Sequence, residues 1–271
     1  MKQRKSALLG IAVGIWIFFT AAWTFGQLPV QTNALYEEHE FRVNNKVTAH
    51  DSGEILSDGK TIFSHGNVYD FLEIAGTISV YNPQKGVFYL LDTNRKEKLI
   101  VTQKEVDTYV ESLRQWGITH ENSNVRVFFV PDFKVQYNSE SRQYTFASEL
   151  LTYFVTPVSP ERAPMLEMYR QFARNSCKFN IMLSPGSKTL FARMQLNETI
   201  FNAGMLINKL QLSIREPRGM GLYSKPQVFL SEYQYLPRLV ESDRVAVRNA
   251  DECIANFKEI TFAQFRKRQM E

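Results

Sequence analysis

The sequence predicts an α+β protein in which helices cover an antiparallel sheet. Between Thr77 and Val101 three short apolar strands alternate with two turns, which is the pattern of an antiparallel meander. A capping-box sequence then begins a helix over residues 103–116 that has a single apolar stripe. After Pro157 the pattern changes to longer helical segments. The chain has 271 residues, 44% of them hydrophobic and 22% charged, which is an ordinary globular composition.

The chain begins with a segment typical of export. Lys2, Arg4 and Lys5 precede nineteen uncharged residues, 7–25, a pattern shared by signal peptides and by short membrane spans. Residues 1–26 are therefore predicted to be either a cleaved signal peptide or an uncleaved membrane anchor, an export or transmembrane helix in both cases. Either one places the body outside the cytoplasm, as a periplasmic protein or as one anchored in the inner membrane and facing the periplasm.

The charge of the body argues against nucleic acid as a partner. Without residues 1–26 the chain carries 29 basic and 28 acidic residues, so the excess of positive charge belongs mostly to the export segment. A nucleic-acid-binding body would normally carry a basic patch.

The first half of the body, residues 36–156, is predicted to be rich in strands. Apolar or alternating runs between turn sequences place strands at 41–48, 61–63, 68–74, 77–81, 87–91 and 98–101, and then at 125–130, 133–137, 143–147 and 151–156. On these later strands Phe128 and Phe129 would point to opposite faces, as would Tyr153 and Phe154. A sheet that is apolar on both faces must be covered on both, by protein or by a ligand.

Four helices are expected, all of them after the meander. Thr102 and Glu105 form the capping box of the first, and Gly117 is expected to end it. Its apolar stripe, which we expect to cover the sheet, consists of Val106, Tyr109, Val110, Leu113 and Trp116. The remaining segments read as helices at 165–177 and 188–203, strands at 209–214 and 227–235, a short helix near 250–257 and a last strand near 260–265. No linker or repeat divides residues 27–271, so a single domain is predicted.

The sequence contains no short catalytic or cofactor-binding motif. There is no G-x-S-x-G, H-E-x-x-H, G-x-x-x-x-G-K-[ST] or C-x-x-C. His39, His50 and His65 share one strand-rich stretch but lack the short spacing of metal ligands. We therefore expect no catalytic residue, no metal, no cofactor and no enzymatic activity.

Cys177 and Cys253 are the two cysteines of the chain. In an oxidising compartment they would be able to form a disulfide, which by the chain-entropy model would stabilise the fold by roughly 4 kcal/mol. The alternative is a pair of buried free thiols, since free cysteine packs like a small apolar residue.

One segment resembles a known family. The sequence GTISVYNPQKGVFYLLDTNRKEKLIVTQKEV is similar to the two hairpins and the following helix of the outer-membrane lipoprotein carrier (LolA/LolB-like) superfamily, and Asp92 with the basic residues after it fits that pattern. The resemblance covers residues 35–156. It implies an antiparallel sheet curled as an unclosed barrel with helices packed over it. Residues 161–204 would be a helical insertion, and they resemble stretches of exported planctomycete-type proteins.

The resemblance also implies a function. It indicates an exported cell-envelope protein that binds the acyl chain of a lipid or lipoprotein in an open β-barrel without catalysis. Apolar side chains suffice for that role, because burying an acyl chain contributes roughly 0.8 kcal/mol per CH₂. The candidate contacts are Phe128, Phe129, Tyr153 and Phe154. Two alternatives stay open: the same residues form a sealed core, or the protein is a membrane-anchored envelope scaffold with a protein partner.

Overall fold

The computed structural model describes residue 36 and residues 39–72, 76–187, 189–215, 217–219 and 222–269. The predicted export segment lies outside these residues. Residues Gln31–Glu271 form one compact unit. Within the described part of the chain, no helix is long and apolar enough to cross a membrane.

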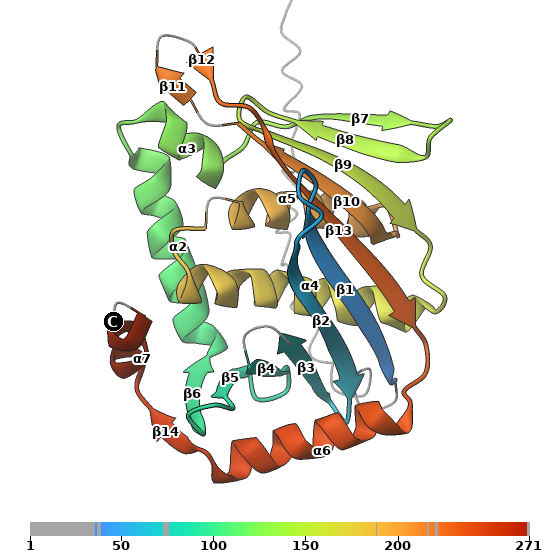
Figure 1. The fold of residues 1–271 in the computed structure, drawn as a ribbon, viewed down its shortest axis with the longest axis vertical. Coiled ribbons are helices and arrows are strands. Elements are labelled where there is room, and N and C mark those ends of the chain that lie inside the picture. The colour runs from blue at the N-terminus through green and yellow to red at the C-terminus, as the bar shows by residue number, and fades with distance from the viewer. Residues whose placement is uncertain are drawn as a thin grey trace, which may run out of the picture. The chain divides into compact units, whose positions relative to one another are not determined.

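The described body is built on one large sheet of twelve strands (Figure 1). Its spatial order is β14-β6-β5-β4-β3-β2-β1-β13-β10-β9-β8-β7. The first half contains β1 (Phe41–Ala49), β2 (Ile55–Ser64), β3 (Asn67–Leu72), β4 (Thr77–Asn82), β5 (Val87–Asp92) and β6 (Glu97–Thr102). The second half contains β7 (Lys134–Asn138), β8 (Gln143–Ala147), β9 (Leu151–Val158), β10 (Leu206–Ile214) and β13 (Gln227–Leu236), and β14 (Lys258–Ile260) returns to the first. A separate two-stranded hairpin pairs β11 (Pro217–Gly219) with β12 (Leu222–Tyr223).

The sheet is open, because its edge strands β14 and β7 do not pair with each other. Neighbouring strands are antiparallel with one exception, the parallel pair of β14 and β6. The predicted α+β class and unclosed sheet are therefore confirmed, and the expected all-antiparallel pairing holds for every strand pair except this one.

Six helices accompany the sheet in the described residues. They are α2 (Gln103–Thr119), α3 (Ser123–Phe129), α4 (Ala163–Leu183), α5 (Leu190–Asn202), α6 (Glu241–Asn256) and α7 (Phe262–Gln269). The predicted capping box at the start of α2 is confirmed: the Thr102 hydroxyl accepts from the Glu105 N–H, and the Glu105 carboxylate accepts from the Thr102 N–H. The hydrogen bond from the Thr102 hydroxyl is the main cause that lowers the pKa of Glu105.

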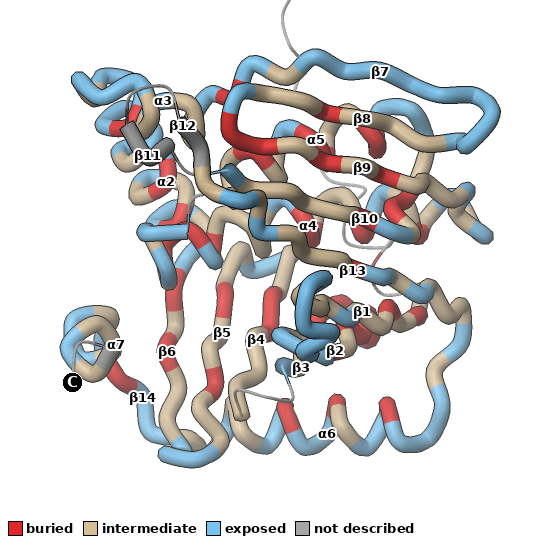
Figure 2. The backbone as a smooth tube through the Cα atoms, turned by 45° about the horizontal axis from the view of Figure 1, so that its top comes forward, coloured by how far each residue is buried: buried red, intermediate tan, exposed pale blue. Residues whose placement is uncertain are grey.

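The two faces of the first half-sheet are covered by different helices. Phe63, Val68 and Phe88 belong to a cluster with α4 and α2, and we call this side the inner face. Their strand neighbours point the other way and pack with Val247 and Ala250 of α6, and we call this side the outer face. Figure 2 shows the buried positions of α6 on its side toward the strands. In the second half-sheet α5 covers the inner face, where Ala192, Leu196 and Ile200 meet strands β8 to β10. Both faces of the sheet are thus covered by the chain itself over most of the first half.

A buried carboxylate holds α6 on the outer face. Asp243 is fully buried and accepts hydrogen bonds from Nη1 of Arg42 on β1, at 3.0 Å to each oxygen. Nζ of Lys60 on β2 lies 3.6 Å away, and the Val240 N–H donates to the same carboxylate at 3.0 Å. One side chain therefore caps the helix and ties it to two strands.

Three elements differ from the sequence expectations. Residues 125–130 were expected to form a strand, but residues 123–129 form helix α3. The expected strand near 260–265 is wrong, since β14 ends at Ile260 and α7 begins at Phe262. The helix expected near 250–257 begins earlier, at Glu241, because Asp243 caps it there.

Candidate functional site

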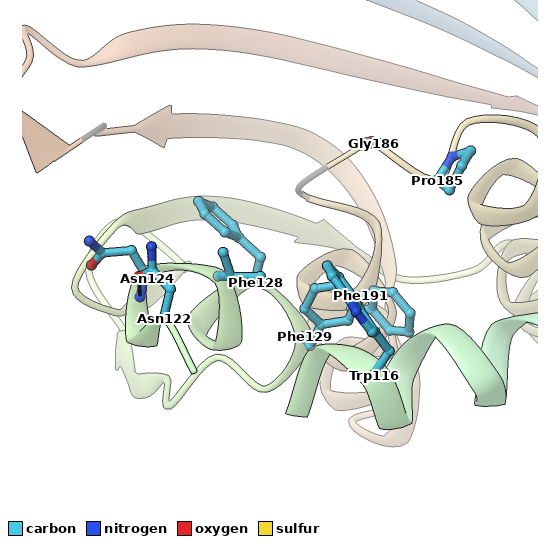
Figure 3. A pocket seen from close by; sticks show the side chains of 10 residues that line it. Trp116, Asn122, Asn124, Phe128, Phe129, Pro185, Gly186 and Phe191 are labelled. Atoms are coloured by element: carbon cyan, nitrogen blue, oxygen red, sulfur yellow. Dashed lines mark hydrogen bonds between the residues drawn. The ribbon is translucent and has the colours of Figure 1, made fainter. Parts of the chain in front are cut away.

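The candidate site lies at the side of the fold where α2, α3 and the start of α5 meet (Figure 3). It is a pocket of about 480 Å³, within the range of roughly 300–1,000 Å³ typical of small-molecule sites. We call it the aromatic pocket. Its wall residues are Trp116, Asn122, Asn124, Val125, Phe128, Phe129, Pro185, Gly186, Ser187 and Phe191.

Helix α3 supplies three apolar side chains of the wall, and local capping explains why this segment is helical. The Asn122 side chain accepts from the Asn124 N–H at 2.9 Å and begins the helix. Nη1 of Arg126 donates to the carbonyls of His120 and Glu121, at 2.6 and 2.9 Å, which fixes the connection from α2. These contacts outweigh the strand preference of the β-branched and aromatic residues. Helical spacing then puts Val125, Phe128 and Phe129 on one face.

Gly117 allows α3 to approach α2 closely. A Cβ at this position would lie 2.2 Å from the nearest ring carbon of Phe129, far inside contact distance. Gly117 therefore does not end the helix as expected; α2 continues to Thr119, and the glycine receives the Phe129 ring. Trp116, which we expected to cover the sheet, is 53% exposed and faces the pocket instead.

The aromatic rings form a connected wall. Phe129 lies at the centre, with ring centroids 5.0 Å from Phe191 and 5.8 Å from Trp116. Trp116 also contacts the ring of His120 edge-on, at 4.9 Å. Figure 3 shows Trp116, Phe129 and Phe191 together. Phe128 lies beside Phe129 on α3, and Pro185 lies apart from these rings. Such a wall favours an apolar guest that is flat or chain-like.

A second hollow adjoins the aromatic pocket and shares Phe129 and Phe191 with it. It has a volume of about 790 Å³ and runs between α2 and α5 toward α4. We call it the charged groove, because its lining includes Asp107, Glu111, Arg114, Arg174, Lys178 and Glu198. An apolar pocket that continues into a charged groove is suited to an amphipathic ligand.

The four predicted contact residues separate in the structure. Phe128 and Phe129 both line the aromatic pocket, although on a helix and not on opposite faces of a strand. Tyr153 is 1% exposed and lies in the core under α5, where burial raises the pKa of its hydroxyl. Phe154 follows it on β9 and points to the other face of the sheet. Two of the four residues therefore line one pocket and Tyr153 is sealed in the core, while contact with a lipid stays a prediction.

The sequence reasoning missed Phe191 and the role of Trp116. Phe191 lies in the first turn of α5, and nothing in the local pattern separates it from the core residues Ala192 and Leu196. For Trp116 the sequence does contain a signal. The helical spacing of Val106 and Val110 continues at position 117, so Trp116 lies at the margin of the apolar stripe of α2 and not at its centre.

The two cysteines do not form the disulfide that the sequence allowed. Cys177 lies on α4 at the inner face, and Cys253 packs on α6 against the outer-face cluster. Both are free thiols, because the sheet separates the faces on which they lie. Burial raises the pKa of Cys177 to about 11 and also raises that of Cys253.

No protein-family model and no curated protein matches this chain. Among solved structures, one similar protein is the LolA superfamily protein NE2245 from Nitrosomonas europaea. The two chains are 9% identical, the match covers 78% of this chain and 94% of that one, and the TM-score is 0.24.

Proposed function

We propose that this protein binds the acyl chain of a lipid or lipoprotein in the aromatic pocket, as a non-catalytic protein of the cell envelope. The observation that carries the proposal is the aromatic wall of exposed Trp116 and half-buried Phe128, Phe129 and Phe191 around a volume of about 480 Å³. This pocket is not the binding place expected from the sequence, which was the curve of the open sheet. The inner face of the sheet is occupied by the protein's own helices, so the ligand would lie beside the sheet and not within its curve.

The size of the pocket fits part of an acyl chain. Each buried CH₂ contributes roughly 0.8 kcal/mol, so six to eight methylenes give about 5–6 kcal/mol before the costs of association. That supports binding without any catalytic group.

Trp116 provides a direct test. Of the three tryptophans, Trp16 and Trp23 lie in the N-terminal segment, so replacing both with Phe in the full chain makes Trp116 the sole reporter. Titration with a C12 amphiphile below its critical micelle concentration is expected to change the Trp116 emission with a saturating curve. Phe128→Ala and Phe191→Ala are expected to weaken binding about tenfold each. Phe154→Ala, on the other face of the sheet, is the matched control.

The proposal would be rejected if no amphiphile changed the emission, or if Phe154→Ala weakened binding as much as the two pocket variants. Native mass spectrometry of the protein, purified gently from its envelope fraction, supplies an independent readout. It would report a co-purified lipid and also show whether residues 1–26 are retained.

One observation favours the alternative, a membrane-anchored scaffold. Every residue of β7 is exposed, and this strand forms an edge of the sheet with Val135 and Tyr137 uncovered (Figure 2). A free edge can pair with a strand of another protein. If the protein is a scaffold, Val135→Lys is expected to abolish the cross-link between this protein and an envelope partner. The same variant should not change amphiphile binding.

A further inference from the structure

The charged groove has two ends of different character. At the end near α4, Nζ of Lys178 lies 2.7 Å from the Asp107 carboxylate. Beside it, Nη2 of Arg174 lies 2.7 Å from Glu198. These two cations are already neutralised by partners within the fold, so this end offers little net charge to a ligand.

Arg114 differs from these cations. It is exposed, and within the described part of the chain it makes no hydrogen bond or ion pair. The other unmatched charge is Glu111, whose carboxylate accepts a hydrogen bond of 2.6 Å from the Gln115 side-chain amide. The guanidinium of Arg114 therefore keeps all of its donors available.

The position of Arg114 connects the groove to the aromatic pocket. It lies one helical turn before Gly117, the residue on which the Phe129 ring packs. Phe129 and Phe191 form the wall common to both hollows. Three charged residues of α2 line the groove, and Arg114 is the one nearest along the helix to Trp116, which lines the aromatic pocket.

We propose that Arg114 binds the anionic head group of the ligand, a carboxylate or a phosphate, while the acyl chain lies in the aromatic pocket. This inference rests on the proposed function and specifies its ligand class as single-chain anionic amphiphiles. Arginine suits the role because its planar fork of N–H donors matches both carboxylate and phosphate oxygens. An exposed ion pair between Arg114 and the head group adds only modestly to the binding free energy. We therefore expect an anionic head group to bind roughly fivefold more tightly than a neutral one.

The test compares amphiphiles that share a C12 chain and differ only in the head group. Laurate and dodecyl phosphate are the anionic probes, dodecyl maltoside is neutral and dodecyltrimethylammonium is cationic. Each is titrated below its critical micelle concentration into the full chain with Trp16 and Trp23 replaced by Phe. Comparison of laurate with dodecyl phosphate distinguishes the two head-group chemistries.

Arg114→Gln is the test variant, and Arg248→Gln is its control, since Arg248 lies on α6 and pairs with Glu241. The unsubstituted protein is expected to bind the anionic probes about fivefold more tightly than the maltoside, and the cationic probe least tightly. Arg114→Gln should remove this preference without changing affinity for the maltoside, whereas Arg248→Gln should retain it. Raising the salt from 0.1 to 1 M should also reduce the preference.

Two results would overturn the inference alone: equal affinities for all four head groups, or an anionic preference that Arg114→Gln leaves intact. Failure of every amphiphile to bind would instead reject the proposed function, and this inference with it.

Discussion

At the scale of single residues, Asp70 is placed where a carboxylate is unfavourable. It lies on β3 opposite Thr61 of β2, on the same face as Phe63 and Val68. The Thr61 hydroxyl donates to it at 2.7 Å, and no ion pair of Asp70 occurs within the described residues. Burial raises the pKa of the Asp70 carboxyl, and the Thr61 hydrogen bond opposes this only in part. The ionised form therefore costs folding stability at neutral pH.

We expect Asp70→Asn to stabilise the protein at pH 7 by about 1 kcal/mol, because the amide keeps an acceptor for Thr61 and carries no charge. The native pKa lies above the unfolded value, so the original protein gains stability as the pH falls through the native pKa toward about 4. The advantage of the variant should shrink over the same range. Urea unfolding from pH 7 to pH 4 measures it, with Asp58→Asn, at an exposed position of β2, as control. A destabilised variant at pH 7 would contradict this account.

At the scale of elements, the contact between α2 and α3 depends on one missing side chain. We expect Gly117→Ala to displace the Phe129 ring, weaken amphiphile binding about tenfold and destabilise the fold by about 1 kcal/mol. Overpacking costs roughly 1–3 kcal/mol, and the better helix propensity of alanine recovers up to about 1 kcal/mol. Trp116 fluorescence and urea unfolding measure the two effects.

Ser112→Ala is the control for Gly117→Ala, because Ser112 is exposed on α2 and does not line the pocket. It should leave binding unchanged. Unaltered binding by Gly117→Ala would show that the position of Phe129 is not important for the ligand.

Helix α6 depends on the buried carboxylate of Asp243. We expect Asp243→Asn to cost about 3 kcal/mol, because Arg42 and Lys60 would face a neutral group at a buried position. Thermal or urea unfolding reports the loss. Glu252→Gln removes a charge from an exposed position of the same helix, and its effect should stay within about 0.5 kcal/mol. Equal effects of the two substitutions would argue against an anchoring role.

The elements also show what the sequence can predict. The meander from β4 to β6 and the capping box of α2 depend on neighbours within a few residues, so local patterns predict them correctly. Helix α3 was predicted to be a strand because its apolar residues fit both periods, and the deciding contacts come from Asn122, Arg126 and Gly117. The pocket could be predicted only in part for the same reason: Phe191 reaches it through tertiary packing alone.

At the scale of the whole molecule, the sheet separates the two thiols. We expect the unfolded, unreduced protein to react with two equivalents of a thiol reagent, since no disulfide forms. In the native state Cys253 should react first, because burial holds the Cys177 pKa near 11 and leaves little thiolate. Cys253→Ser should remove the fast phase, and a reducing agent should not shift the unfolding midpoint. Fewer than two thiols in denaturant would contradict this arrangement.

The central pairing of the sheet joins distant parts of the chain. Strand β1 has β2 on one side and β13 on the other, and its register with β13 pairs Val43 with Tyr235. Until β13 has been synthesised, one edge of β1 has no partner, and β14 reaches β6 later still. Strand pairings between residues so far apart in the sequence slow folding. Until β13 pairs with it, the exposed edge of β1 can associate with other chains. The order of synthesis thus makes the nascent protein most vulnerable over the long interval between the synthesis of β1 and that of β13, when a chaperone that covers the edge of β1 would be of most use.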